Sequence, residues 1–217
     1  TQARTTLEED RALAEAIGEQ DLSATLLSNL SYAYWCSGDR RQARALAEAA
    51  LQEFRTTLDS PYAQAGCQSY LGVYLAEAGE WAAAAAHLAE ARVTFVNIGT
   101  HSSAIEPQAV EATCLLALGR RNEAQQLAAA AWAYLAEHGS TGIDFPTRAY
   151  LCVADVFAAQ ATPEIAPQTV IAAGYRNLMR RAVKISDPVW RRSFLENVAE
   201  HKRLVERWQQ INAPSAS

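Results

Sequence analysis

The sequence of 217 residues has only four cysteines, and they lie far apart. They lack the Cys-x-x-Cys spacing of a zinc site, and they are too few for a secreted domain that disulfides hold together. No apolar run approaches the roughly 18 residues that a membrane span needs, and no basic-then-apolar signal peptide opens the sequence. These absences predict a cytoplasmic protein with reduced thiols and no membrane partner. The cysteines are Cys36, Cys67, Cys114 and Cys152.

The sequence also lacks recognisable catalytic motifs. The four histidines stand alone, without His-x-x-x-His spacing, and neither a glycine-rich phosphate loop nor Gly-x-Ser-x-Gly occurs. We therefore expect no catalytic residue, no metal and no cofactor. An enzyme with a site between helices, around Cys36 or His87, is a third hypothesis, and the sequence supplies no partner residue to activate either side chain.

Glycine and proline are scarce in the segments of regular hydrophobic spacing, where alanine recurs instead. Alanine has the highest intrinsic helix propensity, so the composition predicts an all-α fold. Half of the residues are hydrophobic, which is enough to build a core without disulfides.

A glycine followed five residues later by an alanine returns every 40 or 41 residues. Apolar or small residues at helical spacing lie on both sides of each glycine, as in two antiparallel helices joined by a turn. Self-similarity at this period predicts stacked hairpins, because one hairpin cannot bury its apolar face alone. The pairs are Gly38 and Ala43, Gly79 and Ala84, and Gly119 and Ala124.

Around Leu71, Gly72 and Ala84 the sequence resembles the tetratricopeptide repeat (TPR) family. It departs from the family pattern in having Ser31 and Ala112 where glycine is usual, and in its period of about 40 rather than about 34 residues. The resemblance implies a right-handed α-solenoid of antiparallel helical hairpins, ending in C-terminal capping helices.

The repeat spacing predicts a single array of repeats over residues 1–211. Residues 1–18 correspond to the second helix of a repeat whose first helix is missing, and 212–217 are expected to be a disordered tail. Between them we expect repeats at 22–58, 62–99 and 104–138, an irregular repeat at 146–185 and a capping helix at 188–211.

The segments 184–188 and 191–197 resemble the tail that closes such arrays in bacterial signal-transduction ATPases with numerous domains (STAND) and related transcriptional regulators. With the truncated first repeat, this resemblance implies the sensor region of a larger regulator, with a nucleotide-binding ATPase domain upstream in the same polypeptide. A stand-alone adaptor that joins two proteins is the alternative.

First helices of TPR hairpins line a groove, which predicts one set of ligand-binding residues per repeat. These positions are largely apolar or aromatic, which suits a protein segment or a small-molecule inducer. Because only Asn29 matches the Lys, Arg and Asn of clamps for acidic tails, such a clamp is not expected. The alternative is that some of these side chains pack between repeats. The predicted positions are Asn29, Tyr32, Cys36, Tyr70, Val73, Glu77, Thr113, Tyr150, Val153 and Phe157.

Charge is unevenly distributed along the sequence. Residues 176–208 hold nine Lys or Arg against four Asp or Glu, a balance of +5, so a total of −5 leaves −10 for the remainder. We expect Arg180, Arg181, Arg191 and Arg192 to pair with the acidic body or to line a solvated face. The net acidic charge predicts no direct binding of nucleic acid.

Overall fold

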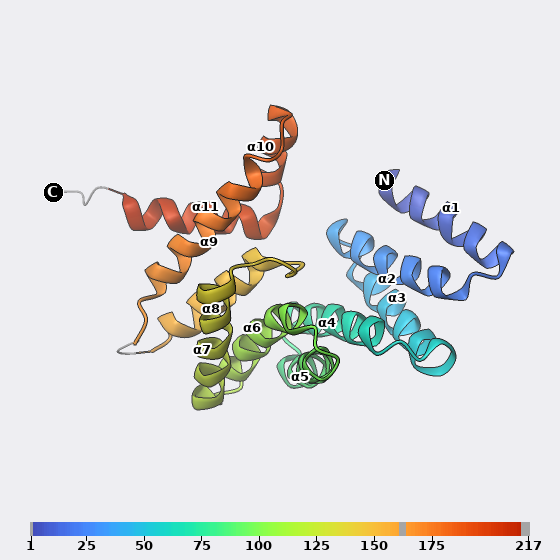
Figure 1. The fold of residues 1–217 in the computed structure, drawn as a ribbon, viewed down its shortest axis with the longest axis horizontal. Helices are drawn as coiled ribbons and strands as arrows, with labels where there is room; N and C mark the ends of the chain where they lie inside the picture. Colours follow the sequence, from blue (N-terminus) through green and yellow to red (C-terminus); the bar gives the residue numbers. More distant parts are fainter. Residues whose placement is uncertain (1, 161–163, 214–217) are drawn as a thin grey trace. The chain divides into compact units, whose positions relative to one another are not determined.

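The computed structural model describes residues 2–160 and 164–213, and within these ranges it contains helices and turns but no strand (Figure 1). The predicted all-α fold is confirmed. The helices are α1 (Gln2–Ile17), α2 (Gln20–Cys36), α3 (Arg40–Glu53), the π-helix η1 (Phe54–Leu58), α4 (Pro61–Glu77), α5 (Trp81–Asn97), α6 (His101–Ala117), α7 (Arg121–His138), α8 (Pro146–Ala158), α9 (Pro167–Ala182), α10 (Pro188–Glu196) and α11 (Ala199–Asn212).

The chain divides into two compact units whose boundary falls inside α6, at Pro107. Unit 1 (residues 1–107) holds the pairs α1–α2, α2–α3 and α4–α5, packed in chain order. Unit 2 (residues 108–217) holds the remainder of α6 and α7 to α11. A single array over 1–211 stays a prediction.

The recurring glycines end the first helix of each hairpin. Gly38, Gly79 and Gly119 have φ angles of +88°, +80° and +78°, a left-handed conformation that glycine adopts without steric cost. In each turn the following residue donates its N–H to a carbonyl five residues back, as Glu80 does to Leu75 at 2.9 Å. This bond satisfies a carbonyl that the helix end leaves open, so the glycine stops the helix.

The recurring alanines lie at the tight contact between paired helices. Ala43, Ala84 and Ala124 are completely buried. In the second hairpin, a Cβ atom added to Gly72 of α4 would lie 2.4 Å from Cγ of Leu88 on α5. This close approach explains a glycine within a helix that it would otherwise destabilise.

Unit 2 closes differently from the earlier hairpins. The sequence predicted one capping helix over 188–211, but the structure has two, α10 and α11. Val198 between them is extended, with φ −88° and ψ 116°. Nδ1 of the buried His201 donates to the Phe194 carbonyl at 2.7 Å, which satisfies a carbonyl at the end of α10. Of the predicted tail, 214–217 lie outside the described residues, as do 161–163 of the linker before α9.

Charge pairs attach α11 to α8. Nη2 of Arg148 lies 2.7 Å from Oε1 of Glu200, and Arg203 and Arg207 both pair with Asp155. The four arginines expected to pair with the acidic body or to line a solvated face take no part in these pairs. Arg191 donates to the Ile185 carbonyl and Arg181 lies over the Phe194 ring. Neither they nor Arg180 and Arg192 form an ion pair in the described ranges, and the exposed Arg180 and Arg192 fit the expected alternative of a solvated face.

His201 makes the stability of unit 2 depend on pH. Burial lowers the pKa of its imidazole, and nearby Arg181 lowers it further. Because the native pKa is lowered, the imidazole of the unfolded chain becomes protonated before that of the native chain as the pH falls through the ordinary pKa of histidine. We expect the free energy of unfolding to fall from about pH 7.5 to about pH 5.5, by at most about 1.4 kcal/mol per pH unit from this residue.

Urea titrations of the chain and of His201→Gln across this pH range measure the effect. The His201→Gln variant should be less stable at the upper pH and show a shallower slope. An identical slope in both proteins would assign the pH dependence to other groups.

Candidate ligand-binding surface

Four aromatic rings from α2 and α4 stack in one row, which we call the aromatic row: Tyr32, Tyr70, Tyr74 and Trp35. Ring centroids are 5.7 Å apart for Tyr32 and Tyr70, 6.3 Å for Tyr70 and Tyr74, and 4.1 Å for Tyr74 and Trp35. The row forms because residues three or four apart share one face of a helix. Two tyrosines predicted to line successive repeats are therefore in contact.

The Trp35 end of the row is held by polar contacts. The hydroxyl groups of Ser31 and Tyr74 are 2.9 Å apart, in a buried hydrogen bond. The Arg40 guanidinium lies 3.6 Å from the Trp35 ring centroid and donates to the Trp35 carbonyl. Because these contacts fix Trp35 and Tyr74, the rings that follow are preorganised for contact with a ligand.

The other end of the row reaches the surface. Tyr32 and Tyr70 are half-buried there and Asn29 is exposed, while Cys36 and Glu77 are exposed toward the Trp35 end. Glu77 also receives an ion pair from Arg40 at 3.4 Å. An aromatic centre with a polar rim is the usual composition of a protein-binding surface. We call these five residues the α2–α4 surface.

The remaining predicted positions are not on a surface of this kind. Val73 is 3% exposed and belongs to the core of unit 1. Tyr150, Val153 and Phe157 are buried in unit 2. The Tyr150 ring packs where α9 carries Gly174, whose missing side chain leaves room for it. These four side chains are therefore buried and do not lie on an exposed surface with Tyr32 and Tyr70.

Thr113 is the last of the predicted positions, and it is half-buried on α6. Its hydroxyl group donates to the Val110 carbonyl at 2.7 Å. This bond within the helix uses the hydroxyl hydrogen, so Thr113 can offer a ligand only the lone pairs of its oxygen.

The environments of one thiol and one histidine are set by burial. Burial raises the pKa of the Cys67 thiol to about 11, which keeps it protonated and unreactive. Burial lowers the pKa of His87, and its Nδ1 atom has no hydrogen-bond partner. Among the described residues, no group of three or more His, Cys, Asp or Glu could hold a metal ion.

None of the described helices is long and apolar enough to cross a bilayer.

Sequence reasoning missed Trp35, Tyr74 and Arg40 as parts of the site. A usable signal was present, because Trp35 follows Tyr32 by three residues and Tyr74 follows Tyr70 by four. This spacing predicts that each pair lies on one helix face. Stacking between the two helices depends on how they are placed, which the spacing does not specify.

No protein-family model matches the sequence, and no curated protein is detectably similar to it. Solved structures of TPR-like repeat proteins are similar in fold. BtubC (BKLC) from P. vanneervenii aligns over 97% of this chain and 89% of its own, at 16% identity and a TM-score of 0.54. A Podosopora anserina protein described as a kinesin light chain with nearly identical TPR-like repeats aligns over 86% and 93%, at 16% identity and a TM-score of 0.52.

These similarities define the class of fold. The chain has the TPR-like helical repeat fold that its resemblance to the TPR family implied.

Proposed function

We propose that this chain is a non-enzymatic protein-binding domain that holds an extended protein segment on the α2–α4 surface. The observation that carries the proposal is the stacking of Tyr32 on Tyr70, with both rings half-buried. A ligand covering these rings gains aromatic contact area at little entropic cost, because the buried end of the row already fixes them.

The polar rim gives such a ligand its direction along the surface. Asn29 supplies an amide that both donates and accepts, while Glu77 supplies a carboxylate. With Arg40 close to Glu77, the rim holds charges of both signs rather than a cationic clamp. This composition suits a mixed polar and apolar segment better than an acidic tail.

We further propose that the domain is the sensor region of a larger bacterial signal-transduction ATPase or transcriptional regulator. Support comes from the sequence resemblance of 184–188 and 191–197 to the tails of such regulators. Ligand binding would then shift the equilibrium between two states that the ATPase domain distinguishes. A small-molecule inducer is the second ligand class, and a stand-alone adaptor is the second function.

Site-specific photo-crosslinking tests the protein-binding proposal. A photoreactive side chain at Asn29, on the α2–α4 surface, should capture a partner in the cells that make this protein. The same group at Gln52, exposed on α3, should not. Capture of the same partner at equal yield from both positions, or from Gln52 alone, would place the binding surface elsewhere.

A further inference from the structure

A cluster of apolar side chains is exposed at the corner between α9 and α10. Val189 and Trp190 are both 73% exposed and Val183 is 65% exposed. Helix α10 buries none of its residues. The corner is nevertheless well formed, because the Asp187 carboxylate accepts hydrogen bonds from the N–H groups of Val189 and Trp190. Apolar side chains held in this way can be buried against a partner without first being ordered.

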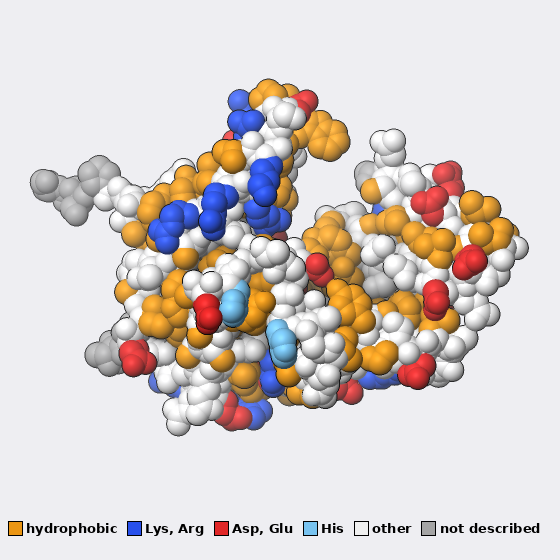
Figure 2. Space-filling view, in the orientation of Figure 1, with side chains coloured by type: hydrophobic (Ala, Val, Ile, Leu, Met, Phe, Trp, Pro, Cys, Tyr) orange, Lys and Arg blue, Asp and Glu red, His pale blue; other side chains and the backbone are white. Residues whose placement is uncertain are grey.

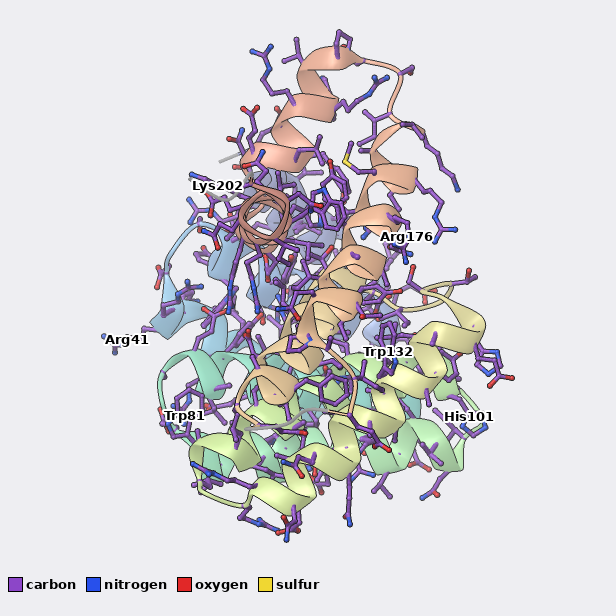
Figure 3. All side chains as sticks on the ribbon, turned by 90° about the vertical axis from the view of Figure 1, so that its left-hand side faces the viewer. Arg41, Trp81, His101, Trp132, Arg176 and Lys202 are labelled. Carbon is purple, nitrogen blue, oxygen red and sulfur yellow. The ribbon has the colours of Figure 1, made fainter. Side chains whose placement is uncertain are left out.

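Cations surround this corner. Arg180, Lys184 and Arg192 are exposed and form no ion pair in the described part of the chain. Figure 2 shows Lys and Arg side chains in a row along α9, and Figure 3 shows Arg176 projecting from the same helix. The one acidic side chain at the corner, Asp187, is engaged in capping α10. We call Arg180, Val183, Lys184, Val189, Trp190 and Arg192 the cationic tip.

Unit 1 contains a cavity with the opposite chemistry. It has a volume of about 350 Å³ and lies where the turn between α1 and α2 meets the end of α3. The π-helix η1 extends α3 at this point and contributes Thr57 and Leu58 to the wall. We call its lining the end pocket: Glu15, Gly18, Gln20, Ser23, Glu53, Thr57 and Leu58.

The end pocket combines carboxylates with an apolar border. Glu15 is paired with Arg11 at 2.7 Å, whereas Glu53 is half-buried and no described residue pairs with it. Ile17 and Leu22 are exposed on the same turn, at 64% and 47%. Unit 1 as a whole has seven Arg against fourteen Asp or Glu, a net charge of −7, while unit 2 has twelve Lys or Arg against ten Asp or Glu, a net charge of +2.

We propose that the cationic tip of one copy of this chain docks on the end pocket of a second copy, with Trp190 entering the pocket. The indole ring of Trp190 fits a cavity of this volume, and its N–H group needs an acceptor that Glu53 supplies. Val189 meets the apolar border at Ile17 and Leu22. Arg192 and Lys184 face the carboxylates of the second copy, which sets the direction of docking.

This contact joins two different surfaces, so each copy keeps one free tip and one free pocket. Such heterologous association continues into chains or closes into a ring. Three apolar side chains, Val183, Val189 and Trp190, are few beside the roughly 20–30 residues that each partner contributes to a standard interface, so the association is weak and depends on concentration. It uses none of the α2–α4 surface and is independent of the proposed ligand site.

Sedimentation velocity of the whole chain over a wide concentration range tests the proposal. The average mass should rise with concentration, and added salt should weaken the rise because exposed charges are screened. Trp190→Ser and Glu53→Lys should each raise the apparent dissociation constant roughly tenfold or more. Trp81→Ser, which alters an exposed Trp of unit 1 away from the pocket, is the matched control and should associate like the original chain.

Mixing the two variants gives the sharpest result. The Trp190→Ser chain retains the pocket and the Glu53→Lys chain retains the tip, so the mixture should form a dimer that extends no further. A mass that stays at one chain at all concentrations, or association that both variants leave unchanged, overturns the proposal. So does a monomeric protein whose Trp190 is needed to bind anionic phospholipid vesicles, because that result assigns the tip to a lipid surface.

Discussion

Replacing Gly72 with alanine should destabilise unit 1 by about 1–3 kcal/mol, although alanine is the better helix former. The new Cβ atom would lie 2.4 Å from Cγ and 2.8 Å from Cδ2 of Leu88, so α4 and α5 must separate or Leu88 must leave its rotamer. Chemical denaturation followed by circular dichroism measures the loss.

Gly66 provides a matched control on the same helix. Nothing lies within 4 Å of a Cβ atom placed there, so Gly66→Ala should raise stability by about 0.5–1 kcal/mol through helix propensity alone. Opposite signs for the two substitutions would confirm the close crossing of α4 and α5. A stabilising Gly72→Ala would contradict it.

The other hairpins indicate how the loss can be compensated. At the positions equivalent to Gly72 and Leu88, the first hairpin has Ser31 and Ala47, and the third has Ala112 and Ala128. A larger residue on the first helix is thus matched by a smaller one on the second. Gly72→Ala should therefore cost much less in a Leu88→Ala background, a non-additivity that a double-mutant cycle measures.

Removing the charge of Arg148 should destabilise unit 2 by about 2–3 kcal/mol, because its pair with Glu200 is largely withdrawn from water. The Arg148 side chain is 11% exposed and that of Glu200 is 31% exposed. Burial raises the pKa of Glu200, but the attraction of Arg148 outweighs it and holds the pKa below its usual range. The variant Arg148→Met would leave this carboxylate without its compensating charge.

The loss of stability caused by Arg148→Met should depend on pH and on the charge of Glu200. A carboxyl group whose pKa is lowered in the native state stabilises the fold at pH values above its ordinary pKa. That contribution is lost as the pH falls through the native pKa. The original chain and Arg148→Met should therefore converge in acid. Arg148→Met with Glu200→Gln should recover part of the loss at neutral pH.

Arg203→Met is the matched control for this pair. Arg203 is exposed, and Arg207 still pairs with Asp155 when Arg203 is removed, so the cost should stay below about 1 kcal/mol. Equal losses for Arg148→Met and Arg203→Met, measured by urea denaturation, would contradict the role given to the Arg148–Glu200 pair.

Most of the helices and turns could be predicted from the local spacing of residues in the sequence. Gly38, Gly79 and Gly119 end helices through a backbone conformation that depends on their own residue type, so they are readable without knowledge of distant contacts. The division at Val198 depends on a bond between His201 and Phe194, which helical periodicity does not reveal. Apolar residues at helical spacing continue from α10 into α11, so the sequence alone does not distinguish two helices that meet at a bend from one unbroken helix.

The candidate site was predictable where repeats follow one another regularly. Tyr32 and Tyr70 occupy successive repeats and meet in the structure. Tyr150 was placed on a surface by the same rule and is instead buried, because Gly174 lets α9 approach its ring. The spacing identifies which helix face a residue lies on, whereas its burial depends on the partner helix.

The central claim is that a protein segment binds across Tyr32 and Tyr70. The most direct measurement is the affinity of the photo-captured partner for the chain carrying Tyr32→Ala and Tyr70→Ala, compared with Tyr62→Ala. Tyr62 is an exposed tyrosine of the same helix as Tyr70, and its ring packs against Phe95 of α5. We predict a loss of at least roughly tenfold for the double variant, with helicity retained, and little change for Tyr62→Ala. Unchanged affinity in a folded double variant would contradict the claim.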